Sequence, residues 1–267
     1  MNRYRYLQAV LALVFVMSAG ILAYQIVYLP MKNREAVEQL KEDFPEGDLP
    51  SGGSSSHGNS SPAGKEKGIP TVDLAALREK YPDVQGWLVI PGTNIDYPVL
   101  QSRETNPEYY LKRNYKGEWN ANGSLFLQWN CKVSESKNLI VYGHNMNSGA
   151  MFGNLDDFAN AEYCREHAQI FFQMTEGVAE YRIAAFMKAD VRMFPFQQAE
   201  FSSVEGLRDY LVQAKALSMF KMEENDSDLF ENGRIAEPDQ VLTLVTCSYE
   251  WKNARNIIVA VREGVVE

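Results

Sequence analysis

An uncharged apolar run occupies residues 7–29, close to the start of the chain. As an α-helix it would be roughly 34 Å long, which exceeds the hydrocarbon core of a bilayer, about 30 Å thick. Arg3 and Arg5 precede the run without an acidic residue before them, a bias that favours a cytoplasmic N-terminus. We interpret residues 1–30 as a single-pass membrane anchor with a short cytoplasmic tail. A cleaved signal peptide is the alternative, although its apolar region is usually shorter, about 7 to 15 residues.

Residues 31–70 lack the apolar content of a folded core and are expected to form a stalk and a linker. Residues 31–43 are charged and compatible with a helix, whereas residues 44–70 are rich in Gly, Ser and Pro, as flexible linkers are. His57 lies in this linker, and we expect it to be inert. The remaining residues, 71–267, are then one extracytoplasmic domain at the cell membrane.

Within this domain most apolar runs are short and rich in β-branched and aromatic residues, a pattern typical of strands. The expected strands are residues 87–90, 95–100, 124–129, 138–142, 179–188, 241–246 and 256–262. Residues 91–94, Pro-Gly-Thr-Asn, are typical of a turn between the first two. Several antiparallel strands in one domain favour a closed or nearly closed barrel, because closure removes exposed strand edges. The fold class predicted is mainly β.

Two helices are expected beside these strands. Residues 71–81 carry apolar side chains at helical spacing and end before Pro82. A longer helix interrupts the late strands, with Ser202 and Glu205 resembling a capping box. Its expected apolar face is formed by Val204, Leu207, Leu211 and Ala214.

Composition narrows the function classes. The formal net charge is −9, and Lys and Arg balance Asp and Glu up to Pro70, so the excess of acids belongs to the domain. Surfaces that bind nucleic acid neutralise phosphates with clustered Lys and Arg, so nucleic acid is not expected as a partner. The chain has three Cys and three His, too few and too scattered for a disulfide scaffold or a metal cluster. We therefore expect no metal and no other cofactor.

Three candidate catalytic side chains lie where predicted strands meet loops. His144 follows the strand 138–142, Cys247 follows the strand 241–246, and Arg255 precedes the strand 256–262. Together they would supply a nucleophile, a proton carrier and a fixed cation. Each residue also has a structural interpretation, since a Cys after an apolar strand is commonly a small core residue. Spacing alone leaves both interpretations open.

From about Tyr81 onward the chain resembles a class B sortase, a membrane-anchored cysteine transpeptidase of Gram-positive bacteria. The segments that carry the resemblance are residues 86–90, 95–101, 123–127, 142–146, 151–152 and 243–247, with Arg255 downstream. The segments around His144 and Cys247 are specific only in combination. The helix near residues 202–218 also resembles the helix that class B members carry between two late strands. The resemblance implies a closed sortase-like β-barrel with an N-terminal helix and this one inserted helix.

By this resemblance His144, Cys247 and Arg255 match the catalytic residues of the family. Asp96 and Leu100 fall where the family lines its substrate groove. The implied partners are sorting-signal peptides of surface proteins and an amine acceptor, from a cell-wall precursor or a pilin. The sequence departs from the family pattern at two other positions. Gln128 stands where an acidic residue is common, and Val245 where serine is common.

Other functions remain open on the sequence. A hydrolytic cysteine peptidase would pass the same acyl group to water, and a non-enzymatic tethered surface domain would merely bury Cys247. An L,D-transpeptidase fits less well, because that family places Ser, Gly, Cys and Arg within one short motif. Cys131 and Cys164 are expected to be structural thiols, with a mutual disulfide as the alternative.

Overall fold

The protein is described by a computed structural model that covers residues 2–45, 71–222, 239–247 and 253–266. Residues 46–70 of the expected linker, with His57, lie outside the described residues. The helices are α1 (Asn2–Ala23), the π-helical η1 (Tyr24–Tyr28), α2 (Leu29–Asp43), α3 (Leu74–Lys80), the 3₁₀ helices η2 (Tyr109–Lys112) and η3 (Gly153–Ala159), α4 (Ala161–Glu166) and α5 (Val204–Leu217). The strands are β1 (Val84–Val89), β2 (Asp96–Gln101), β3 (Leu125–Leu127), β4 (Asn138–Tyr142), β5 (Gln169–Met174), β6 (Gly177–Ala189), β7 (Val241–Cys247) and β8 (Arg255–Val266).

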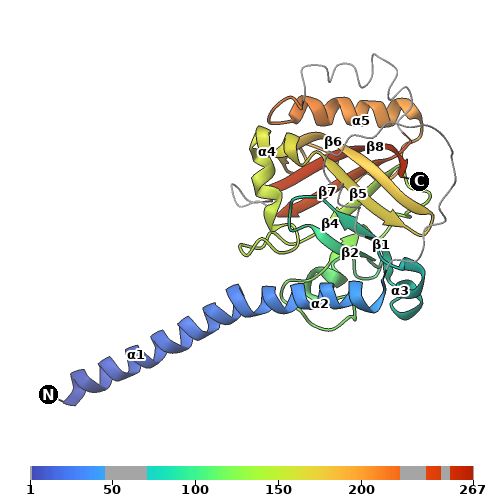
Figure 1. The fold of residues 1–267 in the computed structure, drawn as a ribbon. Helices are drawn as coiled ribbons and strands as arrows, with labels where there is room; N and C mark the ends of the chain where they lie inside the picture. Colours follow the sequence, from blue (N-terminus) through green and yellow to red (C-terminus); the bar gives the residue numbers. More distant parts are fainter. Residues whose placement is uncertain (1, 46–70, 223–238, 248–252, 267) are drawn as a thin grey trace, which may run out of the picture.

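The strands form one closed barrel in the order β1-β2-β3-β4-β7-β8-β6-β5, and β5 pairs back onto β1 (Figure 1). The pairs β2–β3 and β4–β7 are parallel, and the other pairs are antiparallel. Closure pairs both sides of each strand, so the barrel leaves no long open edge. The prediction of a mainly β closed barrel is confirmed.

Each predicted strand overlaps an observed one, but β5 was not predicted. Ile170 and Phe172 of β5 are completely buried, and Phe171 between them is 9% exposed. Since neighbouring residues are buried alike, β5 lacks the alternation of apolar and polar residues that marks a half-exposed strand.

The inserted helix α5 packs on β6 and begins one residue later than predicted. Its N-cap is Ser203, whose hydroxyl accepts a hydrogen bond from the backbone N–H of Gly206 at 3.2 Å. Val204 is 40% exposed and does not belong to the buried face. The buried residues are Leu207, Tyr210, Leu211 and Ala214. Two consecutive serines offer alternative caps, and the structure uses the later one.

A buried polar cluster fixes the register of the parallel pair β4–β7. Thr243 on β7 donates its hydroxyl to the side-chain oxygen of Asn138 on β4 at 2.8 Å. The hydroxyl of Tyr210 on α5 lies 3.0 Å from that of Thr243 and 3.2 Å from the Asn138 amide nitrogen. All three side chains are buried. A shift in register would leave these groups unpaired in the core, which is costly.

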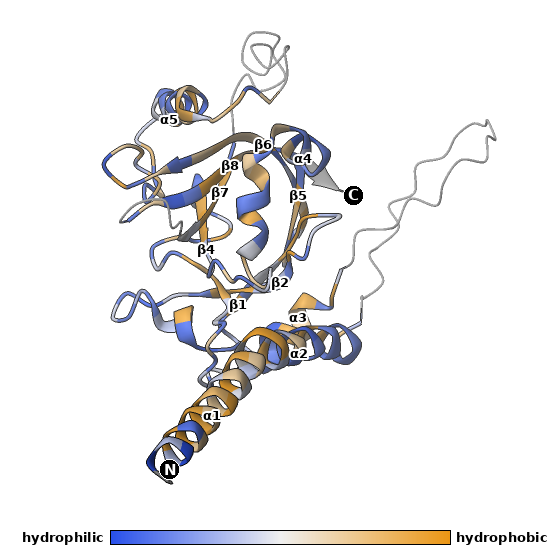
Figure 2. Ribbon diagram, turned by 90° about the vertical axis from the view of Figure 1, so that its left-hand side faces the viewer, coloured by the Kyte–Doolittle hydropathy of each residue, from blue (hydrophilic) through white to orange (hydrophobic). Residues whose placement is uncertain are grey.

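The N-terminal helices run continuously from Arg3 to Asp43, and the first part is apolar and long enough to cross a membrane (Figure 2). This agrees with the expected membrane anchor. Residues 31–43 belong to the helix α2, which packs against the barrel through Val37 and Leu40, 8% and 2% exposed. The apolar pair lies three residues apart and therefore on one face of the helix.

Candidate active site

His144 lies two residues after the end of β4 and is half buried. Its ring nitrogen Nε2 donates a hydrogen bond to the backbone oxygen of Leu111 in η2 at 2.6 Å. Burial lowers the pKa of His144, the hydrogen bond to Leu111 raises it, and the positive charge of Lys112 lowers it, with a net lowering. The site therefore favours the neutral imidazole more than free histidine does.

Cys247 is the last residue of β7 and lies opposite Arg255, the first residue of β8, in the antiparallel ladder. The side chain of Cys247 lies outside the described part of the structure. The guanidinium of Arg255 is half buried, and its Nη1 donates to the backbone oxygen of Ala254 at 2.9 Å. Opposite residues in such a ladder have Cα atoms roughly 4.5–5.5 Å apart. The barrel thus brings the backbone positions of Cys247 and Arg255 together.

The end of β4 is tied to the end of β7. Gly143, immediately before His144, donates its backbone N–H to the oxygen of Val245 at 3.2 Å. Thr246, immediately before Cys247, donates its buried hydroxyl to the oxygen of Gly143 at 2.7 Å. The backbones that carry His144, Cys247 and Arg255 therefore meet at one end of three neighbouring strands.

A groove with a volume of about 990 Å³ opens at this end of the barrel. Gly143, Thr246 and Arg255 contribute to its wall, so it begins beside the three candidate residues. Its further walls include apolar and aromatic side chains together with polar ones. They include Leu111, Phe126, Gln128, Trp129, Tyr142 and Val245. A cavity of this size and mixed lining is of the kind that binds ligands.

Both positions that depart from the family pattern lie in the groove wall. Gln128 accepts a hydrogen bond from the hydroxyl of Tyr142 at 2.8 Å and donates to the backbone oxygen of Gln197 at 2.9 Å. Val245 pairs with Tyr142 of β4 and is completely buried at the groove wall. The groove wall thus carries a neutral amide and an apolar side chain at the two positions where an acid and a serine are common in the family.

Sequence reasoning missed two contributors to the site. Leu111 contacts His144 through its backbone oxygen, and no side-chain pattern reports such a contact. Trp129 lines the groove and is 42% exposed. The available signal was a Trp at the last position of the predicted strand 124–129, because large aromatic side chains are enriched at binding surfaces.

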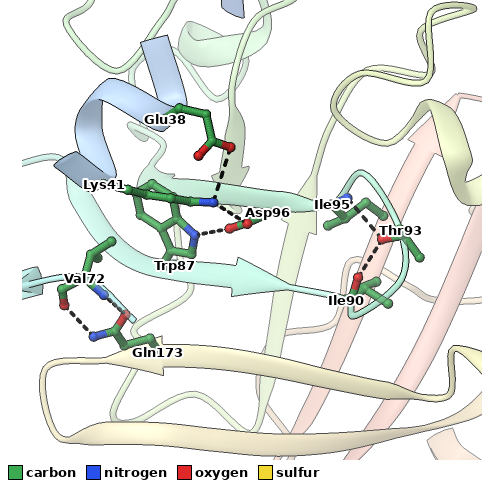
Figure 3. Close-up of polar contacts among 9 residues, drawn as sticks. All are labelled: Glu38, Lys41, Val72, Trp87, Ile90, Thr93, Ile95, Asp96 and Gln173. Atoms are coloured by element: carbon green, nitrogen blue, oxygen red, sulfur yellow. Dashed lines mark hydrogen bonds and ion pairs between the residues drawn. The ribbon is translucent and has the colours of Figure 1, made fainter. Parts of the chain in front are cut away.

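The structure does not bring Asp96 and Leu100 into this groove. Leu100 is completely buried in the core. The carboxylate of Asp96 accepts a hydrogen bond from Trp87 Nε1 at 2.7 Å and forms an ion pair with Lys41 of α2 (Figure 3). Asp96 therefore joins α2 to β1 and β2, and neither residue is among the described residues that line the groove. The sequence pattern placed both residues correctly on one strand, residues 95–100, whereas their place in a substrate groove was implied by the resemblance alone.

Cys131 and Cys164 are buried free thiols, so the alternative of a mutual disulfide is wrong. Burial raises the pKa of Cys131 to about 11 and that of Cys164 to about 12, which keeps both protonated and unreactive at neutral pH. Among the described residues, no group of three or more His, Cys, Asp or Glu side chains is placed to hold a metal ion.

A closed barrel in which cysteine, histidine and arginine positions meet beside one groove is the architecture of a cysteine transpeptidase. The family model described as the sortase domain matches residues 88–263. The chain is 32% identical over 190 residues to Sortase B of Listeria monocytogenes, covering 70% of this chain and 72% of that one. The chain therefore belongs to the sortase family, in class B.

Solved structures agree with this assignment. Sortase B of Clostridium perfringens matches with a TM-score of 0.60 and 27% identity, over 71% of this chain and 98% of that one. A Staphylococcus aureus sortase B–substrate complex matches with a TM-score of 0.61 and 22% identity, over 71% of this chain and 84% of that one. The second likeness concerns the fold alone.

Asp96→Asn tests whether this carboxylate holds α2 or binds substrate. We expect a loss of about 1 kcal/mol in the free energy of unfolding, because the charged interaction with Lys41 is removed. The KM for a sorting peptide should stay unchanged. Lys41→Ala should cause a similar loss, and the double variant should add little to either single one. A raised KM with unchanged stability would instead favour the substrate-binding role.

Lys112→Gln tests the electrostatics of His144. The positive charge of Lys112 disfavours the imidazolium, so its removal should raise the pKa of His144 and increase the protonated fraction at neutral pH. NMR titration of the imidazole signals measures this pKa directly. The effect should shrink in about 1 M salt, where the Debye length is about 3 Å. Lys116→Gln is the matched control, and an equal shift there would contradict a specific effect of Lys112.

Proposed function

We propose that this class B sortase cleaves a C-terminal sorting motif after threonine and transfers the acyl group to an amine. Cys247 attacks the peptide carbonyl and forms a thioester, and the leaving peptide amine takes a proton from His144. An amine from a cell-wall precursor or a pilin then attacks the thioester, releases the thiol and forms the new amide bond. The observation that supports this proposal is the register that sets Cys247 opposite Arg255, with Gly143 and His144 beside Val245 and Thr246.

Protonation limits how much enzyme is active at a given time. With ordinary pKa values of about 8.5 for Cys and 6.5 for His, roughly a tenth of each group is in the required form at pH 7.5. If the two groups titrate independently, about 1% of molecules hold thiolate and imidazolium together. The lowered pKa of His144 reduces this fraction further. Slow turnover follows unless substrate binding shifts the balance.

Arg255 supplies the fixed positive charge of the site. Its guanidinium lines the groove and belongs to the residue paired with Cys247. A carbonyl attacked at this position develops negative charge on oxygen, and a donor already in place stabilises that charge by about 2.7–4 kcal/mol. The same group can orient the substrate backbone.

The groove suits an extended peptide. Phe126 and Tyr142 stack with ring centroids 5.7 Å apart, and Trp129 adds a further aromatic surface. The S. aureus relative binds a substrate in a solved complex, which supports a sorting-signal peptide as the ligand here. Gln128 and Val245 lie in the wall, and we infer that they contribute to the choice of motif.

The membrane orientation is part of the proposal. Arg3 and Arg5 before the apolar helix favour a cytoplasmic N-terminus, so the catalytic domain, residues 71–267, would lie outside the membrane. Surface proteins and wall precursors are on that side. The N-terminal helix is then the contact with the membrane, and residues 46–70 connect it to the catalytic domain.

Acceptor dependence separates transfer from hydrolysis. The protein is incubated with a panel of candidate sorting peptides, with and without a primary amine acceptor, and products are identified by mass. We expect a thioester adduct on Cys247 and a new amide product when the amine is present. Cys247→Ala should abolish both and is the control. Equal rates with only the hydrolysed peptide in both cases would support a cysteine peptidase instead.

Arg255→Lys tests the oxyanion role. A lysine keeps the charge but not the planar guanidinium, so kcat should fall by about a hundred- to a thousandfold. The rate is measured on a peptide that the wild-type protein cleaves. Arg192→Lys, a change of the same type in the groove wall, is the control and should affect kcat far less. Wild-type turnover in Arg255→Lys would exclude the proposed role.

A further inference from the structure

The carboxylate of Asp156 connects two parts of the chain that are far apart in sequence. Its Oδ2 accepts a hydrogen bond from the side-chain amide of Asn145 at 2.9 Å. Its Oδ1 accepts a hydrogen bond from the side-chain amide of Asn256 at 2.5 Å. One side chain thus bridges the loop after β4 and the first residues of β8.

Both asparagines are direct neighbours of proposed catalytic residues. Asn145 follows His144, and Asn256 follows Arg255. Asn145 is 7% exposed and Asn256 is completely buried. Because successive residues share a rigid peptide plane, fixing an asparagine side chain restricts the direction in which its neighbour leaves the backbone.

Asp156 is carried by a well-anchored element. The flanking residues Leu155 and Phe158 of η3 are completely buried, and η3 contacts β6 and β8. The loop from His144 returns to η3 through the backbone N–H of Phe152, which donates to the oxygen of His144 at 3.0 Å. Asp156 itself is exposed, and its carboxylate is held beside the catalytic end of the barrel by the two asparagine amides and by the packing of η3.

We propose that Asp156 is a positioning residue that aligns His144 with Arg255 by holding Asn145 and Asn256. It does not act on the substrate, and the inference rests on the proposed function of these two residues. A carboxylate suits the task because both oxygens accept hydrogen bonds and both partners are amide donors. An amide at position 156 offers only one acceptor oxygen, so one of the two asparagine donors would face another donor.

Asp156→Asn in the full chain is the primary test. We expect kcat for acyl transfer to fall about 10- to 100-fold, because small displacements of catalytic groups have effects of this size. The KM for the peptide should change little, since the groove wall is not altered. Asp157→Asn is the matched control, because this neighbouring carboxylate accepts from Asn154 within the same helix. It should retain wild-type kcat.

An exchange of the two polar groups separates alignment from general stability. In the double variant Asn145→Asp with Asp156→Asn, the new amide donates to the new carboxylate and still accepts from Asn256. Both hydrogen bonds are retained, so most of the lost kcat should return. Thermal unfolding of each variant measures stability separately from kcat. If Asp156 only stabilised the fold, kcat would change only as far as stability does.

Two results would overturn the inference. One is a kcat for Asp156→Asn equal to that of Asp157→Asn, and the other is an exchange variant that recovers stability but not kcat. If Asp156→Asn does not fold, Asn145→Ala and Asn256→Ala each remove one of the two bonds, and wild-type kcat in both would equally contradict it. Absence of acyl transfer in the wild-type protein would instead contradict the proposed function, so the two failures are distinguishable.

Discussion

The register between β4 and β7 is the constraint on which the site depends. It is held at one end by the buried cluster of Asn138, Thr243 and Tyr210, and at the other by the hydroxyl of Thr246 on Gly143. A slip of one residue would turn every side chain of β7 to the opposite face and would unpair these groups in the core. The inserted helix α5 takes part through Tyr210. It therefore helps to fix the register of β4 and β7, although the proposed catalytic residues lie at the other end of these strands.

The groups that hold the site together are neighbours of the proposed catalytic residues rather than those residues themselves. Gly143 and Asn145 flank His144, Thr246 precedes Cys247, and Asn256 follows Arg255. These contacts fix the backbones beside the proposed catalytic residues. The His144 ring and the Arg255 guanidinium each make one bond of their own, to the backbone oxygens of Leu111 and Ala254. The bond to Leu111 favours the imidazolium and partly offsets the burial that disfavours it.

The N-terminal region is more than a tether. α2 contributes Val37 and Leu40 to the core and pairs Lys41 with Asp96, while its polar face remains exposed. It is continuous with the apolar helix that precedes it. The apolar helix is therefore joined to the barrel through the packed helix α2. Composition could not show this, because a helix with few apolar residues is compatible with both a free stalk and a docked one.

Local sequence pattern is enough to predict the strands with strong β-branched runs, the long apolar helix and the three candidate residues at strand ends. These depend on local pattern and on motifs that lie within short segments. It could not report β5, whose residues are buried alike, nor which of two serines caps α5. The folded barrel sets Asp96 against Lys41 and makes Asp156 bridge the loop after β4 and the start of β8. Such contacts join residues far apart in the chain, and their geometry is set by the closure and register of the barrel, which no local pattern encodes.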